Sequence, residues 1–117
     1  MNGVDKPRYP VLVSTRNRKT QEIEDLLDEI RGIYGANSLQ PYGNWDDATS
    51  VGFRVRGIPV TFSVLTDKSL PPRHFNIQIE SYPPGDYLYH DPAVPLWNFL
   101  DLVKLVSGPE DKWPNMK

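Results

Sequence analysis

The chain has 117 residues, a length typical of one domain, and a chain of this size buries roughly two-thirds of its unfolded surface on folding. Its 38% hydrophobic and 24% charged residues exclude disordered and fibrous proteins, and the absence of cysteine excludes disulfides, thiolate zinc sites and a cysteine nucleophile. The formal net charge of -2 argues against nucleic-acid binding driven by overall charge.

Charge is nevertheless distributed unevenly along the chain. Residues 1–20 carry a net charge of +4, with five basic residues and one acidic residue, whereas residues 21–50 carry -6, with one basic residue and seven acidic residues. Residues 1–9 lack the apolar segment of a secretory signal. The most apolar stretch, 96–106, is too short for a membrane span and is interrupted by Asp101 and Lys104. We therefore expect a cytoplasmic protein without membrane contacts, in which any electrostatic function is local.

The first half of the chain predicts one strand, one helix and one long loop. Residues 9–15 (YPVLVST) are apolar and β-branched, which favours a strand. Thr20 suits a helix N-cap, apolar side chains then recur at helical spacing up to Tyr34, and Gly35 is a typical helix stop. Residues 37–50 are rich in turn formers and predict a loop, from which Trp45 packs back onto the domain.

From residue 51 the apolar side chains alternate with a period of two, which predicts strands. Residues 51–55 and 58–64 form two antiparallel strands around a tight turn at Arg56 and Gly57, and residues 75–80 form a third. A short edge strand is expected at 86–89. The polar side chains of these strands would populate one exposed sheet face: Arg54, Arg56, Asn76, Gln78 and Glu80.

Residues 95–106 predict a second helix that is apolar almost all round and is therefore expected to be buried. The predicted fold is α+β: an antiparallel sheet of four to five strands with two helices packed on one face, in the order β-α-β-β-β-(β)-α. It is a single domain over 1–117, with flexible tails at 1–8 and 110–117. The sheet face opposite the helices is a candidate binding surface because nothing is expected to cover it.

No motif predicts catalysis, a cofactor or a metal site. His74 and His90 lack a histidine or cysteine partner at ligand spacing, and the adjacent Asp46 and Asp47 fit a turn better than an acid–base pair. The basic segment 14–20 (STRNRKT) meets a helix start but lacks the glycines of phosphate-binding loops. The element order is also that of double-stranded RNA-binding domains, yet the region before the last helix has no lysines. We therefore predict no enzyme, no cofactor and no metal, and disfavour nucleic-acid binding.

Two features favour protein binding instead. Five acidic residues crowd the first helix, and three tyrosines cluster with His90 between residues 82 and 90. Tyrosine is over-represented among binding hot spots. On a small domain without catalytic motifs, the two features together make a protein-binding role the leading hypothesis.

Residues 93–114 (AVPLWNFLDLVKLVSGPEDKWP) resemble the carboxy-terminal segment of bacterial immunity proteins that neutralise polymorphic or contact-dependent growth-inhibition toxins. In that group a "VPL" start leads into an apolar helix, followed by a Gly-Pro turn and a tryptophan, here Gly108, Pro109 and Trp113. The resemblance implies a stoichiometric inhibitor that binds a toxin with a basic surface. It implies these partner-binding residues: Glu24, Asp25, Asp28, Asp46 and Asp47 as acidic contacts, with Trp45, Tyr87 and Tyr89 as anchors.

Two alternatives remain open on the sequence. One is a small adaptor or secretion chaperone that dimerises through an apolar helix or an edge strand. The other is a phosphate- or RNA-binding module that uses Arg16, Arg18, Lys19, Arg54 and Arg56. The sequence leaves open the partner's identity, the surface that binds it and the oligomeric state.

Overall fold

The computed structural model of the chain describes residues 19–43, 47–82, 86–109, 111 and 113. Helix α1 (Gln21–Tyr34) comes first and helix α2 (Leu96–Val106) comes last. Between them lie five strands: β1 (Leu39–Pro41), β2 (Ser50–Val55), β3 (Val60–Leu65), β4 (His74–Ser81) and β5 (Tyr87–Pro95). All neighbouring strands are antiparallel, and the sheet order β1-β2-β3-β4-β5 follows the chain. The predicted α+β class is confirmed.

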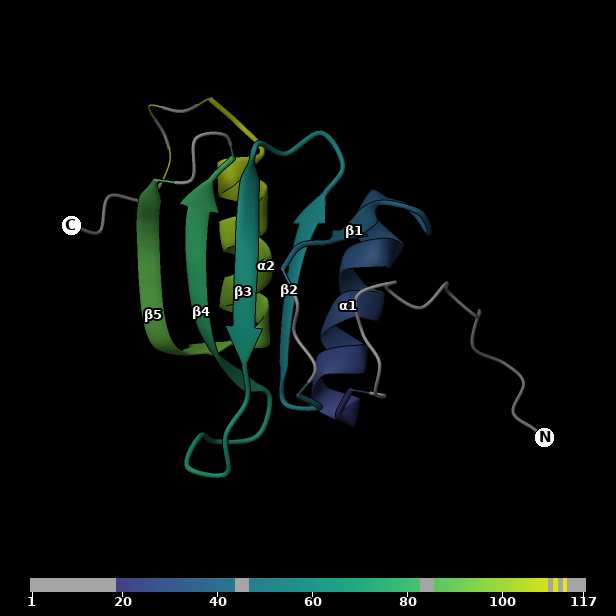
Figure 1. Cartoon of the computed structure of the whole chain (residues 1–117), viewed down its shortest axis with the longest axis vertical. Helices are drawn as coiled ribbons and strands as arrows, with labels where there is room; N and C mark the ends of the chain where they lie inside the picture. Colours follow the sequence, from purple (N-terminus) through teal and green to yellow (C-terminus); the bar gives the residue numbers. More distant parts are fainter. Residues whose placement is uncertain (1–18, 44–46, 83–85, 110, 112, 114–117) are drawn as a thin grey trace.

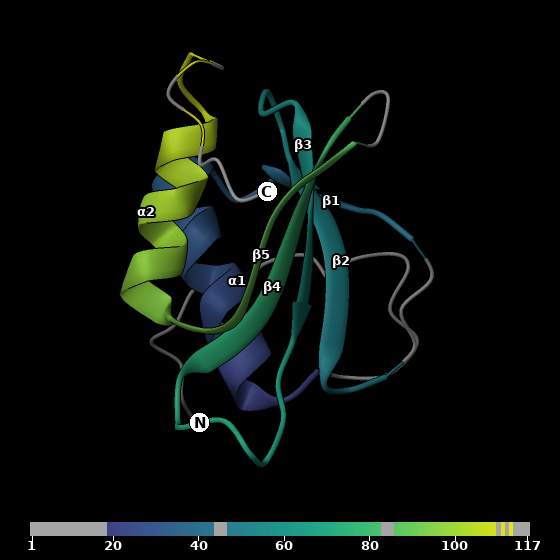
Figure 2. The same cartoon turned by 90° about the vertical axis from the view of Figure 1, so that its left-hand side faces the viewer.

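Both helices cover the same face of the sheet, as predicted. In Figure 1 the sheet is seen from its other face, with α2 behind β3 and α1 to the right of β2, near β1. Figure 2, turned by 90°, shows the two helices on one side of the sheet. The described part of the molecule is therefore a two-layer structure, and its strands present one covered and one open face.

The core lies between the two layers and is built from alternate side chains of the strands. Phe53 and Phe62, on paired positions of β2 and β3, stack with ring centroids 5.3 Å apart. Phe62 also meets Phe99 of α2 edge to face at 5.7 Å. Helix α1 adds Ile23, Leu26 and Ile30, which are fully buried. The alternation in the sequence thus directs the apolar side chains of the strands toward the helices.

Helix α1 begins and ends where the sequence predicts. The Thr20 hydroxyl accepts a hydrogen bond from the Ile23 amide at 3.5 Å, and Gly35 has a φ of 118° after the last turn. The Glu22 carboxylate accepts a hydrogen bond of 2.7 Å from the amide of Arg73, which has a positive φ of 61°. This bond fastens the connection between β3 and β4 to the first turn of α1.

Two expectations from the sequence are wrong. The region 37–50, expected to be a loop, contains β1, because Leu39 pairs with Val55 and continues the sheet beyond β2. Helix α2 is not buried all round, since Trp97 is 63% exposed and Leu105 is 38% exposed. In a two-layer fold only one side of a helix meets the sheet, which leaves Trp97 and Leu105 exposed among the described residues.

Several expectations lie outside the described residues. They are the strand at 9–15, the tail at 1–8, the packing of Trp45, and most of the tail at 110–117.

The outer strands of the described sheet are β1 and β5, and both contain proline. Pro41 ends β1, and Pro92 and Pro95 lie in β5, which is longer than the strand expected at 86–89. The amide of Ala93 donates a hydrogen bond of 3.0 Å to the side chain of Asp91. Proline has no amide hydrogen, so the second half of β5 offers few free donors to another strand.

Candidate functional site

The open face of the sheet carries most of the polar residues that the alternation predicts there. Arg54 of β2 and Asn76, Gln78 and Glu80 of β4 alternate with core residues and point away from the helices. One register row crosses this face from Gly52 through Ser63 and Gln78 to His90. Arg56, which was also expected on this face, lies in the exposed turn between β2 and β3.

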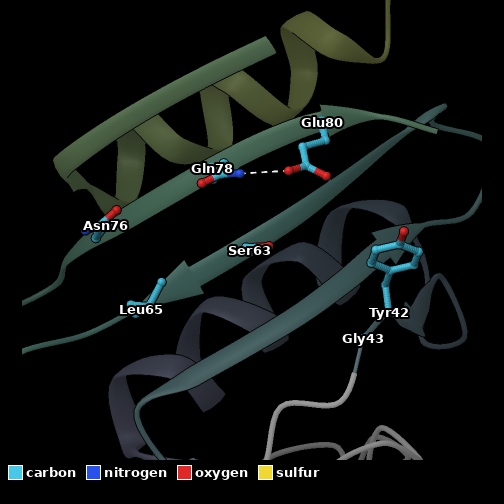
Figure 3. A pocket seen from close by; sticks show the side chains of 7 residues that line it. All are labelled: Tyr42, Gly43, Ser63, Leu65, Asn76, Gln78 and Glu80. Carbon is cyan, nitrogen blue, oxygen red and sulfur yellow. Dashed lines mark hydrogen bonds between the residues drawn. The ribbon is translucent and has the colours of Figure 1, made fainter. Parts of the chain in front are cut away.

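A hollow of about 460 Å³ lies on this face (Figure 3). Strands β3 and β4 form its floor, and the chain that leaves β1 forms one wall. Within the floor, the Gln78 amide donates a hydrogen bond of 2.7 Å to the Glu80 carboxylate. Beside it, the His90 Nε2 atom lies 2.9 Å from the Asn76 Oδ1 atom. The side chains that line the hollow include hydroxyl, amide and carboxylate groups. The lining residues are Tyr42, Gly43, Ser63, Leu65, Asn76, Gln78 and Glu80.

Tyr42, Arg54 and Tyr82 form a cluster next to this hollow, called the tyrosine–arginine cluster below. Tyr42 and Tyr82 meet edge to face with centroids 5.5 Å apart. The Arg54 guanidinium carbon lies 4.2 Å from the centre of the Tyr82 ring. The backbone amide of Tyr42 donates a hydrogen bond of 3.0 Å to the Gly52 carbonyl. The backbone amide of Tyr82 donates one of 3.0 Å to the Pro59 carbonyl. Residues distant in sequence thus meet through backbone pairing at one end of the sheet.

Among the described residues, the Arg54 side chain has neither a hydrogen-bond partner nor an ion-pair partner. Its Nε atom is buried without a hydrogen-bond partner, and no described carboxylate lies within 4.0 Å of the guanidinium. The positive charge of Arg54 is therefore held against the Tyr82 ring and forms no ion pair with Glu80.

The acidic residues predicted to bind a partner lie elsewhere. Glu24, Asp25 and Asp28 are half-buried on α1. Asp25 accepts a hydrogen bond of 2.7 Å from Gln21, and Asp28 forms an ion pair of 3.0 Å with Arg31. Asp47 is exposed, and its carbonyl accepts a hydrogen bond of 2.6 Å from the Lys19 ammonium. Trp45 and Asp46 lie outside the described residues.

The two predicted tyrosines lie on β5, at the other edge of the sheet from β1, and they face opposite ways. Tyr87 pairs with Glu80 on the open face and is 46% exposed. Tyr89 pairs with Ile79 and packs with Leu88 against the core, because a β-bulge interrupts the alternation at this point. The described members of the predicted site therefore do not lie on one surface, and their role in binding stays a prediction.

The pKa of Tyr89 is raised above its ordinary value of 10.0. Burial is the main cause, followed by the negative charge of Asp91 and the hydrogen bond of 3.4 Å from the phenol to that carboxylate. All three effects favour the neutral phenol over the phenolate.

Sequence reasoning identified Arg54, Gln78 and Glu80 as open-face residues but missed Tyr42 and Ser63. Ser63 could have been found by continuing the alternation of β3 onto its polar side. Tyr42 could not, because its place depends on β1, a strand of only 3 residues.

Within the part of the chain that the structure describes, no three histidine, aspartate or glutamate side chains lie close enough together to hold a metal ion. None of the described helices is both long and apolar enough to cross a membrane. Comparisons with protein-family models, with curated proteins and with solved structures found no match to this chain. The functional interpretation therefore rests on the geometry of the site.

Proposed function

We propose that this chain is a cytoplasmic, non-catalytic protein-binding domain that contacts its partner through the open face of its sheet. The tyrosine–arginine cluster is the observation that carries this proposal. Tyrosine and arginine are the side chains most enriched among binding hot spots, together with tryptophan. Here they gather beside a hollow lined with hydroxyl, amide and carboxylate groups.

The guanidinium of Arg54 supports a contact at this position. It has no carboxylate partner among the described residues, and a carboxylate or carbonyl oxygen of a partner would give its terminal nitrogens a hydrogen-bond acceptor. Arginine forms its strongest hydrogen bonds with carboxylates, since its donors match both oxygens. We therefore expect the partner to present an acidic side chain to Arg54.

The resemblance of residues 93–114 to bacterial immunity proteins supports a toxin as the partner. On this proposal the domain neutralises the toxin by binding it one to one, without a chemical step. The acidic residues of α1, Glu24, Asp25 and Asp28, would attract a toxin with a basic surface and speed association.

The test uses the purified protein and the purified product of the neighbouring gene, with the dissociation constant and the residual toxin activity as readouts. Arg54→Ala should weaken binding by about 30-fold, the effect of losing a hot spot of about 2 kcal/mol. Arg56→Ala is the matched control, because it removes the same charge from an exposed turn two residues away. It should leave the dissociation constant nearly unchanged.

The outcomes separate the parts of the proposal. Equal binding by the Arg54→Ala and Arg56→Ala variants would exclude the open face as the contact surface. A neighbouring gene product that neither binds the domain nor loses activity in its presence would contradict the toxin as partner. A melting temperature of Arg54→Ala close to that of the original protein would show that lost binding is not lost folding.

A further inference from the structure

A second hollow lies at the β5 edge, on the side of the sheet that carries the helices. It has a volume of about 350 Å³ and runs between β5 and α2. Val94 of β5 and Leu102 and Leu105 of α2 supply its apolar lining, and Tyr89 adds an aromatic ring. This groove is formed by residues other than those of the open-face hollow.

The two carboxylates of this groove have no cationic partner among the residues that the structure describes. Asp91 and Asp101 both line it, and neither forms an ion pair with any residue that the structure describes. Asp91 accepts hydrogen bonds from the Ala93 amide and the Tyr89 phenol, whereas Asp101 is exposed and accepts none in the described residues. Lys104, three residues further along α2, is exposed and does not line the groove.

We propose that this groove binds a lysine or arginine side chain of the partner protein. The aliphatic stem would lie along Val94, Leu102 and Leu105, and the charged head would reach Asp91 and Asp101. Basic side chains bind in this way because they bury their methylene groups on apolar surface while the charge stays near water or a carboxylate. The inference rests on the proposed function only in assigning the side chain to a partner protein.

The surroundings of Tyr89 agree with this occupant. Burial and the charge of Asp91 already hold its phenol in the neutral state. Because the phenol is neutral, the charge of the groove comes from Asp91 and Asp101 alone among its lining residues. A bound cation would stabilise the phenolate and lower the pKa of Tyr89, so this pKa is a second measure of binding in the groove.

The groove can be tested directly with small cations. The ¹⁵N-labelled protein is titrated with n-butylammonium, and the backbone amide signals are followed by NMR. n-Butanol and n-butyrate, which have the same chain length without the positive charge, are the matched probes. We expect saturable shifts of the Tyr89, Val94, Leu102 and Leu105 signals with n-butylammonium, and weaker responses to the two matched probes.

Variants assign the effect to the two carboxylates. Asp101→Asn should weaken n-butylammonium binding by about fivefold, the range of a single exposed charge pair. Glu29→Gln, an equally conservative change on the exposed side of α1, should leave it unchanged. Because Asp101 is exposed, its replacement should keep the folded NMR spectrum. n-Butylguanidinium, which stays charged at high pH, should lower the pKa of Tyr89.

Equal shifts with n-butanol and n-butylammonium would overturn the inference, because the groove would then select only for apolar surface. Unchanged binding by both Asp101→Asn and Asp91→Asn would overturn it as well. These results do not depend on any toxin, so they are distinguishable from a failure of the open-face proposal.

Discussion

The two faces of the sheet are built from alternate residues of the same strands, yet they differ in almost every property. On β4, Phe75, Ile77 and Ile79 are buried beneath the helices, whereas Asn76, Gln78 and Glu80 are half-buried on the open side. The covered face is apolar and densely packed, and the open face is polar and hollowed. A shift of one residue along a strand therefore moves a side chain from the buried apolar face to the open polar face.

This difference indicates which face of the sheet stabilises the folded domain. Burying a large apolar side chain contributes roughly 1.5–3 kcal/mol, while exposed polar groups contribute little. The covered face thus carries the folding free energy, and the open face is free to vary in shape and charge. The following measurements test that division, beginning with the largest expected effect.

Adjacent residues of β3 provide the strongest test. Phe62→Ala should lower the free energy of unfolding by about 3–5 kcal/mol, because it leaves a cavity between Phe53 and Phe99. Ser63→Ala, its neighbour on the open face, should change it by less than about 0.5 kcal/mol. Urea denaturation measures both. Similar losses in the two variants would mean that both faces contribute to the free energy of unfolding to a similar extent.

The turn between β2 and β3 keeps each residue on its own face, because a slip of one position would exchange them. Gly57 in this turn has a φ of 87°, which other residues adopt only with strain. Gly57→Ala should therefore lower the unfolding free energy by about 1 kcal/mol, although nothing lies close to the added methyl group. Gly32→Ala on α1 is the control.

The control should act in the opposite direction. Gly32 lies in the exposed part of a helix with open space around it, so alanine should raise the unfolding free energy by about 1 kcal/mol. Thermal melting of both variants measures the pair. A stabilising Gly57→Ala variant would contradict the role given to the turn.

On the open face, Gln78→Ala removes the hydrogen bond to Glu80 from the floor of the hollow. We expect the unfolding free energy to change by about 0.5 kcal/mol or less, since the Glu80 carboxylate can bond to water instead. The dissociation constant for the partner should nevertheless rise, because the floor loses a donor. A loss above about 2 kcal/mol in stability would show that this face is part of the core.

The smallest effect concerns pH. The folded-state pKa of Tyr89 is raised, so its contribution to stability is complete below the unfolded pKa of 10.0 and is lost as the pH rises through the folded value. As the pH rises above about 10, the original protein should therefore lose stability relative to Tyr89→Phe. Urea denaturation at several pH values measures this difference. Parallel curves for the two proteins would contradict the raised pKa.

Much of the fold could be predicted because its signals are local. The spacing of Ile23, Leu26 and Ile30 indicates a helix, and alternation indicates β2, β3 and β4. The class and the single helix-covered face follow from these elements. Strand β1 was not predicted, because its three residues, which end in Pro41, are too few to show an alternating pattern.

The site could be predicted only in part, because its geometry depends on contacts between distant residues. Arg54 and Glu80 were recognisable as open-face residues from alternation alone. The approach of Tyr42 to Tyr82 depends on strand order, and the opposite directions of Tyr87 and Tyr89 depend on a bulge that leaves no mark in the sequence. The exposure of Trp97 likewise depends on what lies outside α2.

The composition of β5 has a consequence for how this protein behaves at high concentration. An exposed strand invites other chains to extend the sheet, which is the first step of many aggregates. Pro92 and Pro95 cannot donate, and the Ala93 amide is occupied by Asp91, so half of this strand is a poor template for a neighbouring copy. The domain can thus keep a broad polar sheet face open while its β5 edge discourages self-assembly.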